Sequence, residues 1–93
     1  MKFKSLGKIQ INGEEWDIGY GTPGFTNGKM DEGSCNYTER RITIRRNCVG
    51  SLLSVVAHET IHARLPDLSE KSVNETGDLI SEIYNLFSPQ PTR

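Results

Sequence analysis

Five consecutive residues, His58 to His62, carry the side chains most suited to binding and activating a metal ion. They read His-Glu-Thr-Ile-His within an apolar, helix-compatible stretch. On an α-helix, residues four apart stand one turn above each other, about 6 Å along the axis, so both imidazoles can reach one Zn²⁺. Glu59 lies about 100° around the helix from His58, where a carboxylate can deprotonate water beside the metal. The spacing therefore predicts a zinc site with Glu59 as its general base.

A third ligand is required, because catalytic zinc sites use three protein ligands and keep one open position. Pro66 ends the helix that carries the histidines, and a second helix follows, so the two form an antiparallel hairpin. Counting from the turn brings both Glu70 and Glu75 within reach of the histidines. Spacing alone does not choose between these two carboxylates.

Length and composition limit the other possibilities. The chain has 93 residues, of which 34% are hydrophobic and 25% charged. This is the size of one small domain with a marginal core, which a bound metal would help to hold together. The net charge of −1 favours neither nucleic acid nor an anionic membrane, so we expect a peptide or protein substrate as partner.

Targeting signals and cysteines give little further information about the function of the chain. We find no secretory signal and no run of ~20 apolar residues, so a cytoplasmic location is expected. Cys35 and Cys48 are then expected to be reduced and structural. A disulfide between them, or a role as further zinc ligands, stays open, although no C-x-x-C spacing supports the latter.

Two segments predict a small antiparallel sheet. Residues 8–20 alternate apolar and polar side chains around Asn12-Gly13, a strong hairpin-turn signal, and Trp16 is expected to anchor the core. Residues 41–45 alternate in the same way and predict a half-buried edge strand with a basic outer face. The intervening residues 21–36 are rich in turn formers and predict a long surface loop, either bordering the cleft or mobile.

Two helices complete the predicted fold. The first, about 51–65, is apolar on most of its surface and should be buried. The second, about 69–87, repeats apolar residues every three or four positions, and a disordered tail at 88–93 follows. The expected architecture is therefore one α+β domain over 1–93, with the sheet packed on the helical hairpin.

These residues resemble the gluzincin metallopeptidases, in which H-E-x-x-H is followed by a glutamate ligand on the next helix. The narrower similarity is to small single-domain HExxH proteins of bacteria and phages, related to the minigluzincins. It covers roughly residues 33–87 and is carried by Gly33-x-Cys35, Ile42-x-Ile44, His58 to Ala63, and Pro66-Asp67-Leu68-Ser69-Glu70 with Val73.

The resemblance implies a zinc peptidase with metal ligands His58, His62 and Glu70. It favours Glu70 over Glu75 through the Leu68-Ser69-Glu70 match. Larger gluzincins place this glutamate further along the chain and often have an acid four residues later. This chain has Asn74 at that position.

Two functional hypotheses follow from these patterns. The first is a zinc hydrolase that cleaves peptide bonds, with strand 41–45 pairing with an extended substrate and Tyr37 or Tyr84 stabilising the oxyanion. The second is a non-catalytic binding or regulatory module of a phage or bacterium, in which zinc only stabilises the fold.

Overall fold

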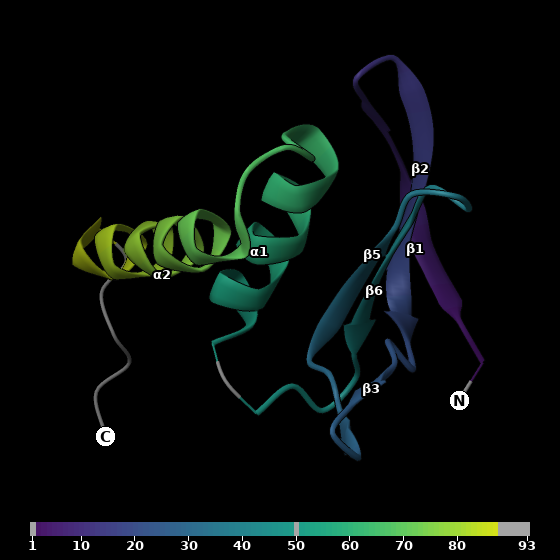
Figure 1. The fold of residues 1–93 in the computed structure, drawn as a ribbon, viewed down its shortest axis with the longest axis horizontal. Coiled ribbons are helices and arrows are strands. Elements are labelled where there is room, and N and C mark those ends of the chain that lie inside the picture. Colours follow the sequence, from purple (N-terminus) through teal and green to yellow (C-terminus); the bar gives the residue numbers. More distant parts are fainter. Residues whose placement is uncertain (1, 50, 88–93) are drawn as a thin grey trace.

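A four-stranded sheet and two helices make up the fold, seen in a computed structural model that describes residues 2–49 and 51–87 (Figure 1). The elements in chain order are β1 (Lys4–Ile11), β2 (Glu14–Gly21), β3 (Phe25–Thr26), β4 (Lys29–Met30), β5 (Gly33–Asn36), β6 (Arg41–Arg45), α1 (Leu52–Arg64) and α2 (Glu70–Phe87). The α+β class is confirmed, and each helix begins and ends within one residue of its predicted bounds. The predicted tail at 88–93 lies outside the described residues.

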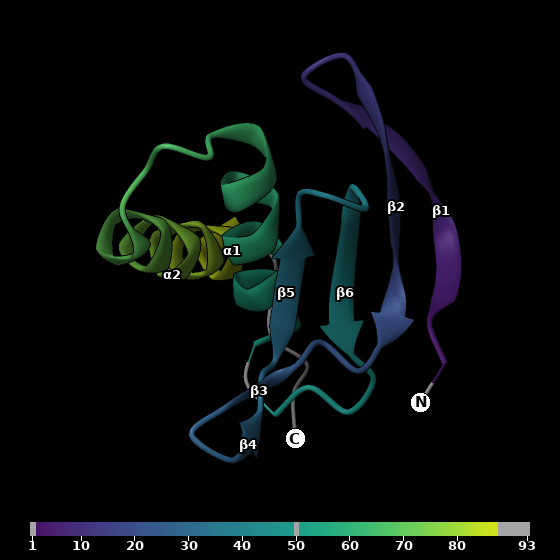
Figure 2. The ribbon, with the colours of Figure 1, turned by 45° about the vertical axis from the view of Figure 1, so that its right-hand side comes forward.

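The layers follow the order sheet, α1, α2. Figures 1 and 2 show α1 between the sheet and α2, and α1 contacts β5 and β6 as well as α2. In the described part of the chain, neither helix is long and apolar enough to cross a membrane.

The sheet is antiparallel-rich but mixed, with the strand order β1-β2-β6-β5. β1 pairs with β2 and β5 pairs with β6 in antiparallel fashion, whereas β2 and β6 are parallel. The parallel pair arises because the chain leaves β2, adds β5 at the outside of the sheet and then turns back to insert β6 between them.

Two sequence predictions about this region were wrong. Residues 21–36 are not one long loop, because they contain the β3–β4 ribbon and the edge strand β5. Strand 41–45 is not an edge strand, because β5 covers its outer side. The sequence of β5, Gly-Ser-Cys-Asn, has no strong strand former, so its pairing with β6 rather than local propensity makes it a strand.

Burial in β6 extends to both faces of the strand, so the predicted solvated basic face was also wrong. Ile42, Thr43 and Ile44 are all buried. The guanidinium of Arg41 lies over the ring of Phe3, 4.1 Å from its centroid, which helps to cover the second face of the strand.

The Asn12-Gly13 hairpin turn is confirmed and also fastens the sheet to α1. Both residues adopt positive φ, 53° and 79°, as a tight two-residue hairpin turn requires. The side-chain amide of Asn12 donates a hydrogen bond of 3.0 Å to the carbonyl of Arg64. This bond satisfies a helix-terminal carbonyl that has no partner inside the helix.

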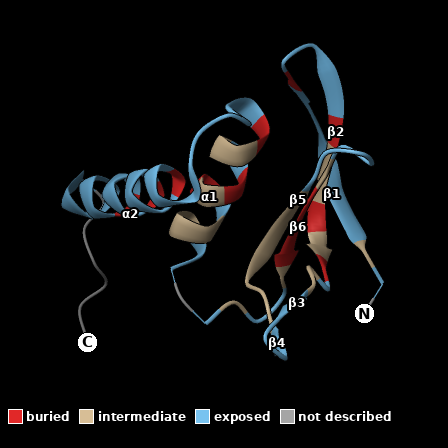
Figure 3. Cartoon of the chain, in the orientation of Figure 1, coloured by how far each residue is buried: buried red, intermediate tan, exposed pale blue. Residues whose placement is uncertain are grey.

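The core is small and lies between the sheet and α1 (Figure 3). Trp16 is 3% exposed, which confirms it as a core anchor. The prediction that α1 is buried on most of its surface was wrong, because only Ala57, Glu59 and Ala63 are buried on it. Without a further layer, the opposite flank of α1 stays exposed, as at Val56.

The apolar stripe of α2 is also largely uncovered. Only Val73, Gly77 and Ser81 are buried on this helix. Ile80, at 40%, and Phe87, at 83%, are exposed, because α2 packs on α1 and extends beyond it without reaching the sheet (Figure 1). The apolar period predicted the helix correctly, but most of that stripe does not face α1.

Gly77 sets how closely the two helices approach. A Cβ added there would lie 3.2 Å from the carbonyl oxygen of Ser54 and 3.5 Å from the amide nitrogen of His58. A hydrogen bond of 2.8 Å that Ser54 donates to Asp78 lies beside this contact. The close contact therefore holds the first turns of α2 against the helix that carries the histidines.

We expect Gly77→Val to separate the helices and lower the free energy of unfolding by about 1–3 kcal/mol, as overpacking usually does. Urea denaturation measures this change. Thr76→Val, which places the same side chain on an exposed neighbouring position, is the control and should stay within about 0.5 kcal/mol of wild type. Equal stability of the two variants would contradict the close packing.

Candidate metal centre

Three potential ligand atoms converge where α1 meets the start of α2. The Nε2 atoms of His58 and His62 lie 3.2 Å apart, and Oε1 of Glu70 lies 3.0 Å from the first and 2.8 Å from the second. Among the described residues, these three side chains form a group that could hold a metal ion. Both imidazole side chains are about one-fifth exposed, whereas the Glu70 carboxylate is 72% exposed.

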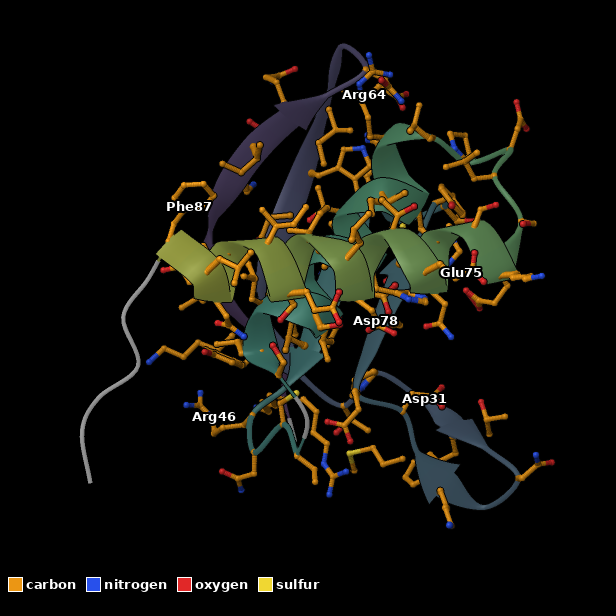
Figure 4. All side chains as sticks on the ribbon, turned by 90° about the vertical axis from the view of Figure 1, so that its left-hand side faces the viewer. Asp31, Arg46, Arg64, Glu75, Asp78 and Phe87 are labelled. Carbon is orange, nitrogen blue, oxygen red and sulfur yellow. The ribbon has the colours of Figure 1, made fainter. Side chains whose placement is uncertain are left out.

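The position of Glu70 follows from how α2 begins. Ser69 accepts a hydrogen bond of 3.1 Å from the amide of Ser72, so it caps the helix and makes Glu70 the first helical residue. The side chain of Glu70 then reaches back across the turn to the last two turns of α1. Glu75 is exposed and does not line the cavity beside the histidines; Figure 4 labels it on α2.

The separations of these atoms match a zinc site. Donors bound tetrahedrally at ~2.0–2.1 Å from Zn²⁺ lie about 3.3 Å from one another, close to the observed 2.8–3.2 Å. Three lone pairs facing each other at such distances repel unless a cation or a shared proton lies among them. A metal ion suits the donor set, and an imidazole that carries its hydrogen on Nε2 and donates it to Glu70 is the metal-free alternative.

Glu59 is buried beside this group, in the gap between α1 and β5. It is 7% exposed, and burial raises its pKa. The two neighbouring histidines lower this pKa, whereas the negative charges of Glu70 and Asp31 raise it further. A carboxylate in this environment is a stronger base than a solvated one and is suited to taking up a proton.

Gly33 of β5 leaves the space that Glu59 occupies. A Cβ at this position would lie 3.0 Å from Cγ of Glu59 and 3.1 Å from its Oε2. The edge strand therefore passes directly over the carboxylate, and a larger residue would displace it.

A cavity of about 520 Å³ opens in front of these residues. Its walls come from α1, the start of α2, β5 and the β3–β4 ribbon. It is lined by Thr26, Asp31, Glu32, Gly33, Cys35, Tyr37, Ser54, Val55, His58, Glu59, His62, Glu70 and Asn74. The possible metal ligands and the candidate base thus share one solvent-accessible space, which a closed structural zinc site would not need.

Of the two tyrosines predicted as oxyanion helpers, only Tyr37 lines the cavity; Tyr84 lies on α2, 54% exposed. The hydroxyl of Tyr37 donates a hydrogen bond of 2.7 Å to the carbonyl of His62, and burial raises the pKa of this phenol to about 12. Its ring meets Trp16 edge-on, with centroids 5.9 Å apart. Tyr37 therefore ties the β5–β6 turn to the end of α1 that carries the histidines.

No disulfide joins Cys35 and Cys48. Cys35 faces the cavity beside Tyr37, and burial raises its pKa to about 11, so its thiol stays protonated and unreactive near neutral pH. Cys48 instead donates a hydrogen bond to the carboxylate of Glu32. Neither sulfur belongs to the group of possible metal ligands.

Glu32 joins three segments at the lower end of the cavity. Its carboxylate accepts hydrogen bonds from the backbone amide of Val49 at 2.9 Å and from Nη1 of Arg45 at 3.2 Å, in addition to the Cys48 thiol. These bonds lower the pKa of Glu32, the thiol contributing most. They hold the segment leading into α1 against the start of β5.

The structure brings the predicted residues His58, Glu59, His62 and Glu70 to one cavity, but the sequence did not predict the residues of the opposite wall. Asp31, Gly33 and Cys35 fell in the stretch predicted to be a loop, although Gly33 and Cys35 had entered the family resemblance. The two-residue spacing of Gly33 and Cys35 was the available signal of a strand, because residues two apart lie on the same face of a strand.

Comparison of the chain with protein-family models, with curated proteins and with solved structures gives no significant match. The interpretation of this centre therefore rests on its own residues and geometry.

We expect Glu32→Gln to reduce the acid sensitivity of the fold. Because the folded-state pKa of Glu32 lies below its unfolded value, the carboxylate stabilises the protein above that unfolded value, and the stabilisation is lost as the pH falls through the folded pKa. Melting temperature measured from pH 7 down to pH 3 should fall less steeply in the variant. Glu82→Gln, a substitution on the exposed face of α2, should follow the wild-type curve; if Glu32→Gln does so too, the carboxylate does not hold these segments.

Proposed function

We propose that this chain is a small zinc-dependent peptidase of the gluzincin type. The observation that carries the proposal is the convergence of His58 Nε2, His62 Nε2 and Glu70 Oε1 within 3.2 Å, beside the buried carboxylate of Glu59 and open to a cavity. His58, His62 and Glu70 would hold Zn²⁺. The bound ion would supply Lewis acidity, which polarises a scissile carbonyl and lowers the pKa of water towards ~7.

Glu59 performs the proton transfers in this proposal. Its raised pKa lets it accept the proton of the attacking water and then give it to the leaving amine. Glu59 would not be a metal ligand, because its carboxylate lies under Gly33 rather than with the three donor atoms. Metal binding and proton transfer are thus assigned to different side chains.

The substrate pairs with β5 rather than with β6 in this proposal, because β5 is the edge strand on the side of the cavity. An extended peptide can add to a free sheet edge through main-chain hydrogen bonds, with alternate side chains entering the cavity. With a shallow site formed by one small sheet and two helices, short peptides or exposed loops are the expected substrates.

The alternative function is a non-catalytic module in which zinc only stabilises the fold. The small core favours it, since Val73 is the one large side chain among the described residues that is under 2% exposed. The open cavity and the buried Glu59 favour catalysis.

Metal analysis of purified variants tests the ligand assignment. Glu70→Ala and His62→Ala should each lose most of the bound zinc, because removal of one of three ligands greatly weakens the site. Glu75→Ala, which removes the same kind of side chain from an exposed site away from the cavity, should retain stoichiometric zinc. Zinc retention unchanged in all three variants would overturn the proposed site.

Glu59→Gln separates the two functions. We expect it to lower hydrolysis of a peptide library at least ~10²-fold, the lower end of the contribution of a general base. Its zinc content should equal that of wild type, and its melting temperature should not fall, because the substitution removes a buried charge. If the wild type cleaves no peptide while holding zinc, the non-catalytic alternative is correct.

A further inference from the structure

Asp31 is the one carboxylate of the cavity wall that has no assigned partner or role. The other three are Glu59 and Glu70, which belong to the proposed centre, and Glu32, which is bound by Arg45 and Val49. The side chain of Asp31 makes no hydrogen bond and no ion pair within residues 2–49 and 51–87. Its charge is therefore not balanced by the protein.

The backbone holds Asp31 in place even though its side chain is free. The Asp31 amide donates a hydrogen bond of 2.8 Å to the carbonyl of Gly24, which closes the base of the β3–β4 ribbon. Asp31 is partly buried there, between β4 and β5 (Figure 4). Thr26, from the other strand of the ribbon, lines the cavity beside it.

This position lies along the path of a peptide paired with β5. Gly33 and Cys35 of β5 line the cavity, and Asp31 lines it too, two residues before Gly33 and beyond a bend at Glu32. Side chains of an extended peptide alternate between the two sides of the strand. The charge of Asp31 acts on Glu59 and raises the pKa of that carboxyl, so a side chain of a peptide paired with β5 would meet Asp31 in the same cavity as the candidate base.

The charge of the cavity determines which side chain is favoured there. Among the described residues that line it, none is Lys or Arg, and four are acidic. A divalent ion would be balanced by the Glu70 and Glu59 carboxylates, which leaves Asp31 as an uncompensated negative charge. A cationic group entering the cavity would meet no competing positive side chain.

We propose that Asp31 is a specificity-determining residue that binds a lysine or arginine side chain of the peptide substrate next to the scissile bond. This inference rests on the proposed peptidase function and names its substrate class. Asp31 would contribute to substrate binding and would take no part in proton transfer.

Binding of zinc-directed peptide analogues tests this without turnover. Peptide hydroxamates that carry lysine, norleucine or glutamate at the position following the chelating group would be titrated into the zinc-loaded wild-type protein by calorimetry. Norleucine has the length of lysine without its charge. We expect the lysine compound to bind about three- to tenfold more tightly than the norleucine compound, the range of a partly screened ion pair.

Matched variants assign the preference to Asp31. Asp31→Asn should abolish the difference between lysine and norleucine, and Asp31→Lys should favour the glutamate compound. Glu75→Gln removes a carboxylate outside the cavity and should keep the wild-type preference. Circular dichroism of each variant confirms that the fold is retained.

The outcomes distinguish this inference from the proposed function. If zinc is retained and all three hydroxamates bind equally, or if Asp31→Asn keeps the preference for lysine, Asp31 does not set specificity although the metal site stands. If the protein retains no zinc and binds no hydroxamate, the proposed function fails, and the assignment of Asp31 fails with it.

Discussion

The contact between α1 and α2 is the constraint on which the candidate metal centre depends. An H-E-x-x-H helix supplies two imidazoles by itself, but the third donor must arrive from another element at a separation of about 3 Å. Gly77 permits the close approach of the helices, and the Ser69 cap fixes where α2 starts. Together they bring the first carboxylate of α2 to the histidines and leave Glu75 outside the cavity.

The sheet contributes the other half of the site. β5 covers Glu59, and Gly33 leaves just enough space for its carboxylate, so the candidate base is desolvated without being shut off from the cavity. Tyr37 and Asn12 then fasten the sheet to the last turn of α1 through bonds to backbone carbonyls. The base and the potential ligands are therefore positioned by different contacts of the same helix, with the cavity between them.

The small core explains why a metal ion would matter to this fold. Buried apolar side chains lie mainly between the sheet and α1, whereas most of the apolar stripe of α2 is exposed. Little hydrophobic burial then holds α2 in place, apart from its packing around Val73 and Gly77. A ligand bridging α1 and Glu70 would add stability where α2 begins, because binding to the folded state alone stabilises it.

The sequence by itself determined the local features of this protein: both helices, the Asn12-Gly13 hairpin and the spacing of His58 and His62. Each depends on periodicity, turn chemistry or the fixed geometry of one helical turn, which neighbouring residues dictate. Spacing alone left Glu70 and Glu75 unresolved, although the family resemblance favoured Glu70, and β5 was missed, because a helix-to-helix distance and a strand pairing involve residues far apart in the chain. Only the tertiary structure decided which carboxylate meets the histidines and which residues form the opposite wall, since packing, capping and register act across elements that the sequence pattern describes one at a time.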